Sequence, residues 1–134
     1  MKQTIEEQNK ALVLEAFDAI FNKRDDTAYE RYWAPDYIQH SAHIPPGRDG
    51  LRGLVTLTPA TMRYEHQLVV ANGDYVMIYG RFSGIAQPKA WVVVDIVRIA
   101  GGLLAEHWDV VQDEASEAES KSGHPMFGNA FSEV

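Results

Sequence analysis

The chain has no cysteine, which excludes disulfide bonds, thiolate metal ligands and a cysteine nucleophile. It also lacks any apolar run long enough to span a bilayer, and residues 1–7 carry acidic side chains where a secretory signal has an apolar core. We therefore expect a protein of the cytoplasm that has no membrane partner.

Positive charge is scarce, since 12 lysine and arginine residues stand against 19 aspartate and glutamate residues and give a formal net charge of −7. The basic residues are scattered singly and form no stripe. Nucleic-acid binding draws most of its affinity from basic side chains on phosphates, so this pattern argues against a nucleic-acid partner.

The length of 134 residues suits one domain, and 46% hydrophobic with 23% charged residues is ordinary for a globular protein. From Asp113 the chain is polar up to Gly123. We expect a single domain over residues 1–113. A C-terminal tail over residues 114–134 is then either flexible or packs on the pocket or on a dimer partner.

Helices are expected before strands. Apolar residues in 5–21 recur at helical spacing, and Asp25 or Asp26 can cap a second, short helix that carries Trp33 and ends at Pro35. The segments that follow are typical of a short strand at 37–40, a loop at 41–50, and one or two turns of helix at 51–57.

The second half alternates apolar and polar residues with the period of a strand. Strands are expected at residues 62–70, 75–85, 89–99 and 103–112. An Asn-Gly-Asp turn and a Gly-Gly turn separate two of the pairs. Consecutive strands with short turns form an antiparallel sheet, and helices grouped on one side of it give the α+β class.

Asp95 stands alone among valine and isoleucine in its strand. An ionised carboxylate in such surroundings is costly unless it is paired or hydrogen-bonded, so Asp95 either faces a wet cavity or has a partner such as Arg81 or Arg98. If residues 100–102 form a three-residue hairpin loop, Asp95 faces His107 and Val93 faces Asp109. A two-residue Gly-Gly turn would instead place Asp95 opposite Trp108.

The first register brings Asp95, His107 and Asp109 to one face of the sheet, where they suit proton transfer. Two nearby carboxylates repel each other, so the pKa of at least one rises, and a histidine can orient or protonate its partner near neutral pH. The alternative is an ordinary ion pair at the surface of an edge strand.

Two histidines, His40 and His43, follow the short strand. Together with His107 and Asp109 they could form a metal site, but a His-x-x-His pair in a loop is weak evidence, and we expect no metal. His40 could instead line the mouth of a pocket. Aromatic side chains near the aspartates would complete the usual pattern of a ligand site. The candidates for substrate binding are Trp33, Tyr37, His40, Tyr79 and Trp91.

Three segments together resemble the SnoaL-like polyketide cyclase family of the nuclear-transport-factor-2-like superfamily. They are residues 34–40 (APDYIQH), residues 44–47 (IPPG) and residues 104–110 (LAEHWDV). The resemblance covers roughly residues 5–112. The Pro-Pro-Gly loop and the His-Pro-Met-Phe sequence of the tail are similar to a bacterial subgroup of predicted aldol-condensation enzymes.

The resemblance implies a cone-shaped fold, in which a strongly bent antiparallel or mixed sheet wraps around a long helix and encloses a pocket. It also implies a homodimer formed through the outer face of the sheet. Cyclases of the family use an aspartate of the last strand as a general acid/base without a cofactor. Asp109 matches that aspartate, and His107 matches the histidine two residues before it.

The sequence also departs from the family. Asp95 stands where the cyclases tend to have a histidine. A pair of carboxylates looks more like the epoxide hydrolases of the superfamily, but those keep an arginine where this chain has Val93. We therefore expect an enzyme without a cofactor that resembles an aldol cyclase or an isomerase and acts on a small, carbonyl-bearing, polyketide-like molecule. The alternatives are a non-catalytic ligand-binding protein, an enzyme like the epoxide hydrolases, and a protein-interaction module with a filled core.

Overall fold

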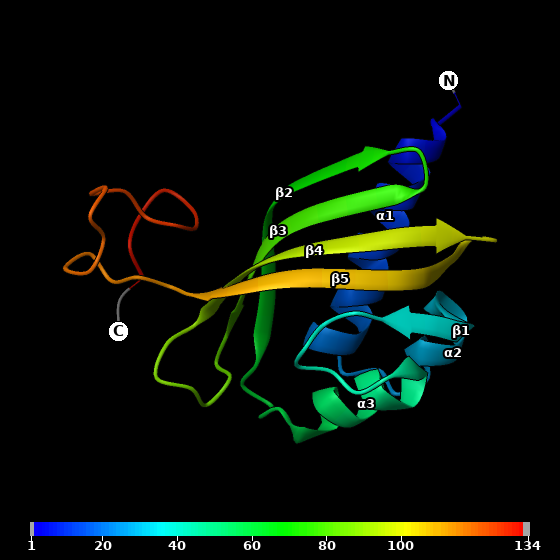
Figure 1. Ribbon diagram of the computed structural model, residues 1–134, viewed down its shortest axis with the longest axis horizontal. Coiled ribbons are helices and arrows are strands. Elements are labelled where there is room, and N and C mark those ends of the chain that lie inside the picture. Colours follow the sequence, from blue (N-terminus) through cyan, green and yellow to red (C-terminus); the bar gives the residue numbers. More distant parts are fainter. Residues whose placement is uncertain (1, 133–134) are drawn as a thin grey trace.

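The computed structural model describes residues 2–132, so Met1 and residues 133–134 of the expected tail lie outside the described residues. Helices come first and strands follow (Figure 1). The elements are α1 (Ile5–Phe17), the π-helix η1 (Asp18–Asn22), α2 (Ala28–Tyr32), β1 (Trp33–Gln39), α3 (Gly47–Leu57), β2 (Arg63–Asn72), β3 (Tyr75–Ser83), β4 (Trp91–Ala100) and β5 (Leu103–Asp113). The α+β class expected from the sequence is confirmed.

The first helix begins at a capping box. The Thr4 side chain accepts a hydrogen bond from the Glu7 backbone, and the Glu7 carboxylate accepts one from the Thr4 backbone. The helical spacing predicted for residues 5–21 is found as α1 and its continuation η1. One face of this helix, including Val13, Phe17 and Ile20, is buried against the sheet.

Among the boundaries that differ from the sequence prediction, those of β1 and α3 have clear physical reasons. Trp33 begins β1 and is not part of the second helix, and Pro35 lies inside that strand. A proline is tolerated there because β1 is an edge strand, where one side needs no backbone donor. The third helix begins at Gly47, within the predicted loop, because the extended Pro46 precedes it and Asp49 lies in its first turn.

The five strands form one mixed sheet in the order β1-β5-β4-β3-β2, in which β1 runs parallel to β5 and the other pairs are antiparallel. Strands β2 to β5 curve across α1, and α2 and α3 lie at the end where β1 joins the sheet (Figure 1). The inner face of the sheet meets these helices, so the core and the cavity described below lie between the two layers.

The β4–β5 hairpin corrects both registers considered for Asp95. Its turn is the two-residue Gly101-Gly102, and both glycines have the positive φ that such a turn requires, 59° and 75°. A bulge at Ala105 then shifts the pairing by one residue. Asp95 therefore pairs directly with Asp109, not with His107 or Trp108, and His107 pairs with Val97.

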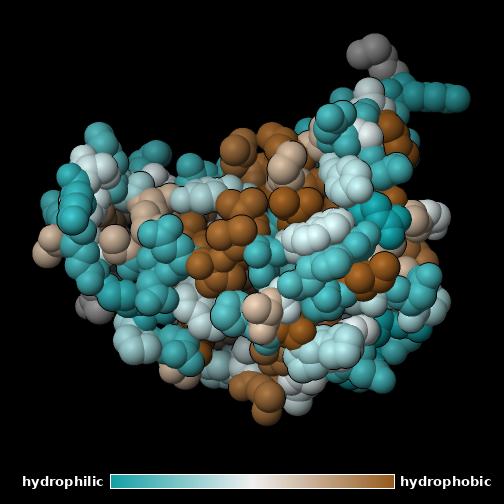
Figure 2. Space-filling view, viewed as in Figure 1, coloured by the Kyte–Doolittle hydropathy of each residue, from teal (hydrophilic) through white to brown (hydrophobic). Residues whose placement is uncertain are grey.

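The outer face of the sheet carries an apolar surface, which we call the outer patch. Figure 2 shows it as a brown area over the strands. Its exposed members are Leu68, Val70, Tyr75, Met77 and Val110. Among the described residues, no helix is long and apolar enough to cross a membrane.

The described part of the tail folds back beside the sheet (Figure 1, orange to red). Glu114 accepts a hydrogen bond from Arg81 at 2.7 Å, and the Gly128 backbone donates to Gln67 at 2.7 Å. The Tyr79 hydroxyl donates to the Met126 carbonyl. Residues 114–132 are thus attached to β2 and β3.

Candidate functional site

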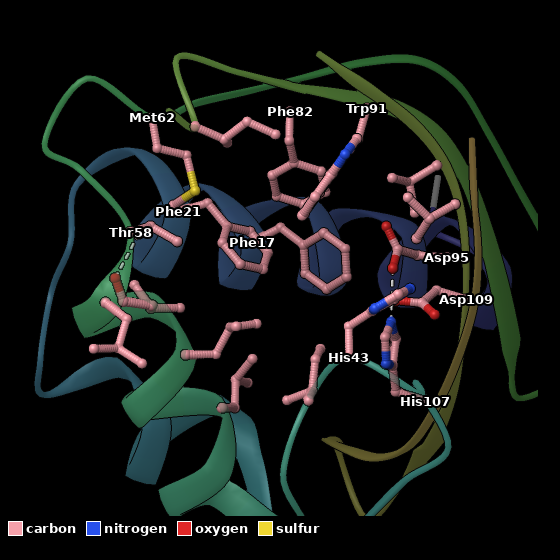
Figure 3. Close-up of a pocket in the computed structure, with 18 of the residues that line it drawn as sticks. Phe17, Phe21, His43, Thr58, Met62, Phe82, Trp91, Asp95, His107 and Asp109 are labelled. Atoms are coloured by element: carbon pink, nitrogen blue, oxygen red, sulfur yellow. Dashed lines mark hydrogen bonds and ion pairs between the residues drawn. The ribbon is translucent and has the colours of Figure 1, made fainter. Parts of the chain in front are cut away.

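A cavity of about 350 Å³ lies between the inner face of the sheet and the helices (Figure 3). Most of its wall is apolar, with phenylalanines from α1, η1 and β3 and aliphatic side chains from α3. These residues are Phe17, Phe21, Phe82, Leu51, Leu54, Val55 and Leu57. Such a wall excludes water from a bound molecule and strengthens the electrostatic interactions of the few polar groups inside it.

Three ionisable side chains gather at one end of the cavity, where Asp95, His107 and Asp109 point inward from β4 and β5 (Figure 3). One ligand atom of each residue lies within 4.8 Å of the others. Asp95 and His107 are buried, with exposed fractions of 4% and 6%, and Asp109 is half-buried. The bulge at Ala105 puts all three on the same face, because it restores the alternation that the two-residue turn would have offset.

The orientation of His107 is fixed by Gln39, which is the last residue of β1. The Gln39 Oε1 atom accepts hydrogen bonds from the Ser41 backbone N–H, at 2.9 Å, and from His107 Nδ1, at 2.6 Å. A backbone N–H can only donate, so the amide oxygen must face Ser41. His107 Nδ1 therefore carries a proton and donates it to Gln39.

This tautomer determines the contact on the other side of the ring. His107 Nε2 lies 2.6 Å from Asp95 Oδ1, which is hydrogen-bond distance. One proton lies between the two atoms, either on Nε2 beside an ionised Asp95 or on Oδ1 beside a neutral imidazole. Burial raises the pKa of Asp95, and the hydrogen bond and charge of His107 oppose that rise. The pair thus holds one mobile proton inside the cavity wall.

Asp109 differs from Asp95 because its carboxylate has no hydrogen bond or ion pair with any other described residue. All the described partners of the cluster instead join Asp95, His107 and Gln39. The three clustered side chains are close enough to ligate one ion, but Asp95 and His107 already satisfy each other. The four-residue metal set that included His40 and His43 is not assembled, since His40 lies elsewhere.

Tyr37 adds a hydrogen-bond donor to the cavity. Its hydroxyl accepts a hydrogen bond from Gln39 Nε2 at 2.9 Å, so its own proton is directed to another acceptor. Burial of the side chain raises the pKa of Tyr37, and the charges of Asp95 and Asp109 raise it further. The hydroxyl therefore stays protonated and can donate to an oxygen atom of a bound molecule.

Of the five predicted binding residues, Trp33, Tyr37 and Trp91 line the cavity, whereas His40 and Tyr79 do not. The His40 ring stacks on Trp108 with centroids 4.8 Å apart, and its Nε2 lies 2.7 Å from Glu106. The Tyr79 side chain lies on the outer face of β3, where its ring lies beside Phe127 of the tail. Alternation along each strand separates these residues from the inward-facing ones.

The sequence reasoning missed Gln39, the helix phenylalanines Phe17 and Phe21, and the position of His43 at the cavity. Gln39 could have been found, because it lies two residues after Tyr37 in the same strand and so shares its face. Phe17 and Phe21 lie four residues apart and share a face of the helix, but no pattern in the sequence says that this face meets the aspartates.

Comparisons with known proteins agree on the fold. A family model for the SnoaL-like domain matches residues 13–107, and no curated protein gives a significant match. A proposed ketosteroid isomerase from Kribbella flavida DSM 17836 is 18% identical, with a TM-score of 0.70 and 82% of each chain covered.

Two further solved structures come from Streptomyces. AclR, a proposed hydroxylase from Streptomyces galilaeus, is 24% identical with a TM-score of 0.63, over 78% of this chain and 89% of that one. IdmH, a proposed polyketide cyclase from Streptomyces antibioticus, is 22% identical with a TM-score of 0.63, over 78% and 92%. At these identities the likenesses show the fold alone.

Proposed function

Because the chain belongs to the SnoaL-like domain family of the nuclear-transport-factor-2-like superfamily, we propose that its cavity catalyses proton transfer on an uncharged, apolar molecule with a carbonyl group. The reaction would resemble that of an aldol cyclase or an isomerase and would use no cofactor. A fold does not determine a function, so the proposal rests on the site itself.

The unequal surroundings of the two aspartates carry the proposal. Asp95 is committed to His107 by a 2.6 Å hydrogen bond, whereas Asp109 has no protein partner among the described residues and borders the cavity. A general base must be able to reach the substrate proton without first breaking a strong bond. Asp109 is therefore the acid/base, and Asp95 with His107 forms the neighbouring proton store.

Tyr37 would stabilise the charge that develops during the reaction. When a carbon next to a carbonyl loses its proton, the electron pair moves onto the carbonyl oxygen and makes an enolate. A hydrogen-bond donor already in place at that oxygen lowers the barrier. The Tyr37 hydroxyl is such a donor, because Gln39 occupies its acceptor side and its proton is directed elsewhere.

The steps balance without a further reactant. Asp109 takes the proton from the carbon next to the carbonyl, and the enolate forms against Tyr37. In an aldol closure, the enolate carbon then bonds to a second carbonyl carbon of the same molecule, and Asp109 returns the proton to the new alkoxide oxygen. In an isomerisation, Asp109 returns the proton to a different carbon. Both reactions share the first step.

The cavity wall supports an uncharged, apolar substrate. No lysine or arginine lines the cavity among the described residues, so an anionic substrate would meet two carboxylates without either of these residues as a counter-charge. The same observation weakens the epoxide-hydrolase alternative, which needs an arginine where Val93 stands. The cavity between the sheet and the helices also argues against the hypothesis of a protein-interaction module with a filled core.

A non-catalytic ligand-binding protein is the second candidate, because most of the cavity wall is apolar. That reading expects Asp109 to be stably paired. The hydrogen bonds of the cluster instead leave Asp109 aside and join Asp95 to His107, which supports catalysis.

The proposal can be tested before the natural substrate is known, because the first step is common to both reactions. The purified protein would be mixed with 2-tetralone, an uncharged two-ring ketone, in D₂O, and loss of the protons next to the carbonyl followed by ¹H NMR. We expect exchange faster than in buffer alone. Asp109→Asn should slow the catalysed exchange ~100-fold or more, because an amide cannot accept the proton.

Asp113→Asn is the matched control, since Asp113 is an exposed carboxylate of the same strand. It should exchange at the rate of the unmodified protein. If Asp109→Asn also exchanged at that rate, Asp109 would not be the base. If 2-tetralone shifted the resonances of cavity residues but its protons did not exchange, the hypothesis of a non-catalytic ligand-binding protein would replace that of an enzyme.

A further inference from the structure

Two buried polar atoms of this molecule have no hydrogen-bond partner among the described residues. They are the hydroxyl oxygen of Tyr64 and Oδ2 of Asp95. Leaving either atom unsatisfied in a buried position is costly. The Tyr64 hydroxyl can donate a hydrogen bond and Asp95 Oδ2 can accept one, so the two atoms have complementary hydrogen-bond roles.

Tyr64 and Asp95 both face the inner side of the sheet. Tyr64 lies on β2, and the tip of its ring packs on Gly80 of β3. Gly80 pairs with Val93 of β4, and Asp95 is two residues further along that strand on the same face. Gly80 and Asp95 are thus diagonal neighbours, whose Cα atoms lie about 7–8 Å apart, so the Tyr64 hydroxyl beside Gly80 and the Asp95 carboxyl occupy the same part of the inner face.

The glycine at position 80 is what allows this approach. A Cβ atom there would lie 2.5 Å from the Tyr64 hydroxyl oxygen and 2.7 Å from the ring carbon Cε1. The tyrosine would have to move away, because its ring is held among Phe17, Phe21 and Phe82 and cannot simply rotate at its end.

The state of the hydroxyl also suits a donor. Burial raises the pKa of Tyr64, and the negative charge of Asp95 raises it further. The second effect requires the carboxylate to be near the hydroxyl. Tyr64 therefore keeps its proton at neutral pH, so its hydroxyl can donate to a neighbouring acceptor.

We propose that Tyr64 is a positioning residue, whose hydroxyl donates to one buried water that donates in turn to Asp95 Oδ2. A buried water needs at least two polar partners, and these two atoms supply them. The proposal rests on the proposed function only for its consequence in catalysis, since the water and its two contacts can be observed without a substrate.

The consequence concerns the proton shared by Asp95 and His107. A hydrogen bond to Oδ2 favours the ionised carboxylate over the neutral acid. It therefore moves the shared proton from Asp95 Oδ1 toward His107 Nε2. Tyr64 would thus set which partner holds the proton, although it does not line the cavity itself.

Tyr64→Phe tests this in a protein whose histidines carry ¹⁵N. In the unmodified protein we expect the His107 Nε2 resonance near the protonated range, and in the variant a shift toward the unprotonated range of a neutral imidazole. Tyr29→Phe is the control, because it removes the hydroxyl of another largely buried tyrosine, on α2, and it should leave the resonance unchanged. An unchanged resonance in Tyr64→Phe would overturn the proposal.

The melting temperature gives an independent sign. If the hydroxyl is bound through water, Tyr64→Phe lowers the melting temperature by removing that hydrogen bond. If the hydroxyl is truly unsatisfied, the same change raises it, since a costly buried group is lost. A rise would contradict the proposal.

A crystal structure of the unmodified protein at high resolution covers the case in which Tyr64→Phe does not fold. We expect an ordered water within hydrogen-bond distance of both the Tyr64 hydroxyl and Asp95 Oδ2. Density that shows either atom bound to another group, with no shared water, would refute the proposal. Neither result depends on turnover, so the failure of this proposal and the failure of the proposed function can be told apart.

Discussion

Asp95 and Asp109 are identical residues that pair directly across β4 and β5, yet their surroundings differ. Asp95 is buried against His107, with Tyr37 on β1 and Tyr64 on β2 close enough for its charge to affect them. Asp109 is half-buried and borders the open volume. Environment, not residue type, thus separates the two carboxyls, and under the proposed function Asp95 would store a proton while Asp109 exchanges one.

The raised pKa of Asp95 predicts how stability depends on pH. Because the folded-state pKa is above the ordinary value of 3.8, the stabilising contribution of the protonated acid is complete below that pH. It is lost as the pH rises through the folded-state pKa. Asp95→Asn removes this dependence. The unfolding free energy of the variant should therefore rise relative to that of the unmodified protein between pH 4 and pH 8.

Urea unfolding at several pH values measures this difference. The partners that face Asp95 are His107, Asp109, Tyr37 and Tyr64, and all of them remain in the variant. The exposed Asp36→Asn is the control, for which we expect a difference that does not change with pH. If the unfolding free energy of Asp95→Asn did not rise relative to that of the unmodified protein between pH 4 and pH 8, the Asp95 carboxyl would not be penalised by burial.

At the scale of single elements, the sequence predicted the order of helices and strands and the shared face of the catalytic candidates. It missed the pairing inside the β4–β5 hairpin. The turn can be predicted from its two glycines. The bulge at Ala105 has no such sequence signal, since alanine also occurs in strands without a bulge.

The rest of the site could not be read from the sequence because it depends on contacts between distant elements. Gln39 reaches His107 only because β1 joins the sheet parallel to β5, at its edge. No short turn connects two strands that lie far apart in the sequence, so the sequence does not indicate that they pair. The apolar helix residues of the cavity were visible as a helix face, but not as part of a cavity.

Helix α3 offers a prediction at this scale. Gly53 is exposed in the middle of the helix, and a Cβ atom there would meet nothing within 4 Å. Gly53→Ala should therefore raise the unfolding free energy by about 0.5–1 kcal/mol, because glycine loses more backbone freedom on folding. Exchange of 2-tetralone protons should be unaffected.

Gly102→Ala is the matched opposite, since Gly102 also has open space but a φ of 75°. It should destabilise the protein by about 1 kcal/mol, because an L-residue pays a steric penalty in the left-handed region. Urea unfolding measures both variants. If the two changes shifted stability in the same direction, backbone conformation would not be what separates the two positions.

At the scale of the whole molecule, the outer patch bears on assembly. Leu68, Met77 and Val110 are all exposed on the same side of the sheet, and Val110 is 71% exposed. Large apolar surfaces on a sheet face commonly mark an interface, and a self-complementary face favours a twofold dimer. We propose a homodimer in which the outer patches of two copies face each other.

A charge placed in the outer patch should disrupt this dimer. We expect the unmodified protein to sediment as a dimer at micromolar concentration and Met77→Glu to sediment as a monomer, because a buried carboxylate without a partner is costly. Ile5→Glu, on an exposed apolar residue of α1, should leave the dimer intact. A monomeric unmodified protein would refute the proposal.

The bulge at Ala105 has a further consequence for how this hairpin can change in evolution. Side chains alternate along a strand, so inserting or deleting one residue between the turn and His107 would move both His107 and Asp109 to the opposite face. After such a change the His107 and Asp109 side chains would lie on the outer face of the sheet, and Trp108 would point into the cavity. Relatives that keep the site should therefore gain or lose residues here in pairs, or compensate one insertion by losing the bulge.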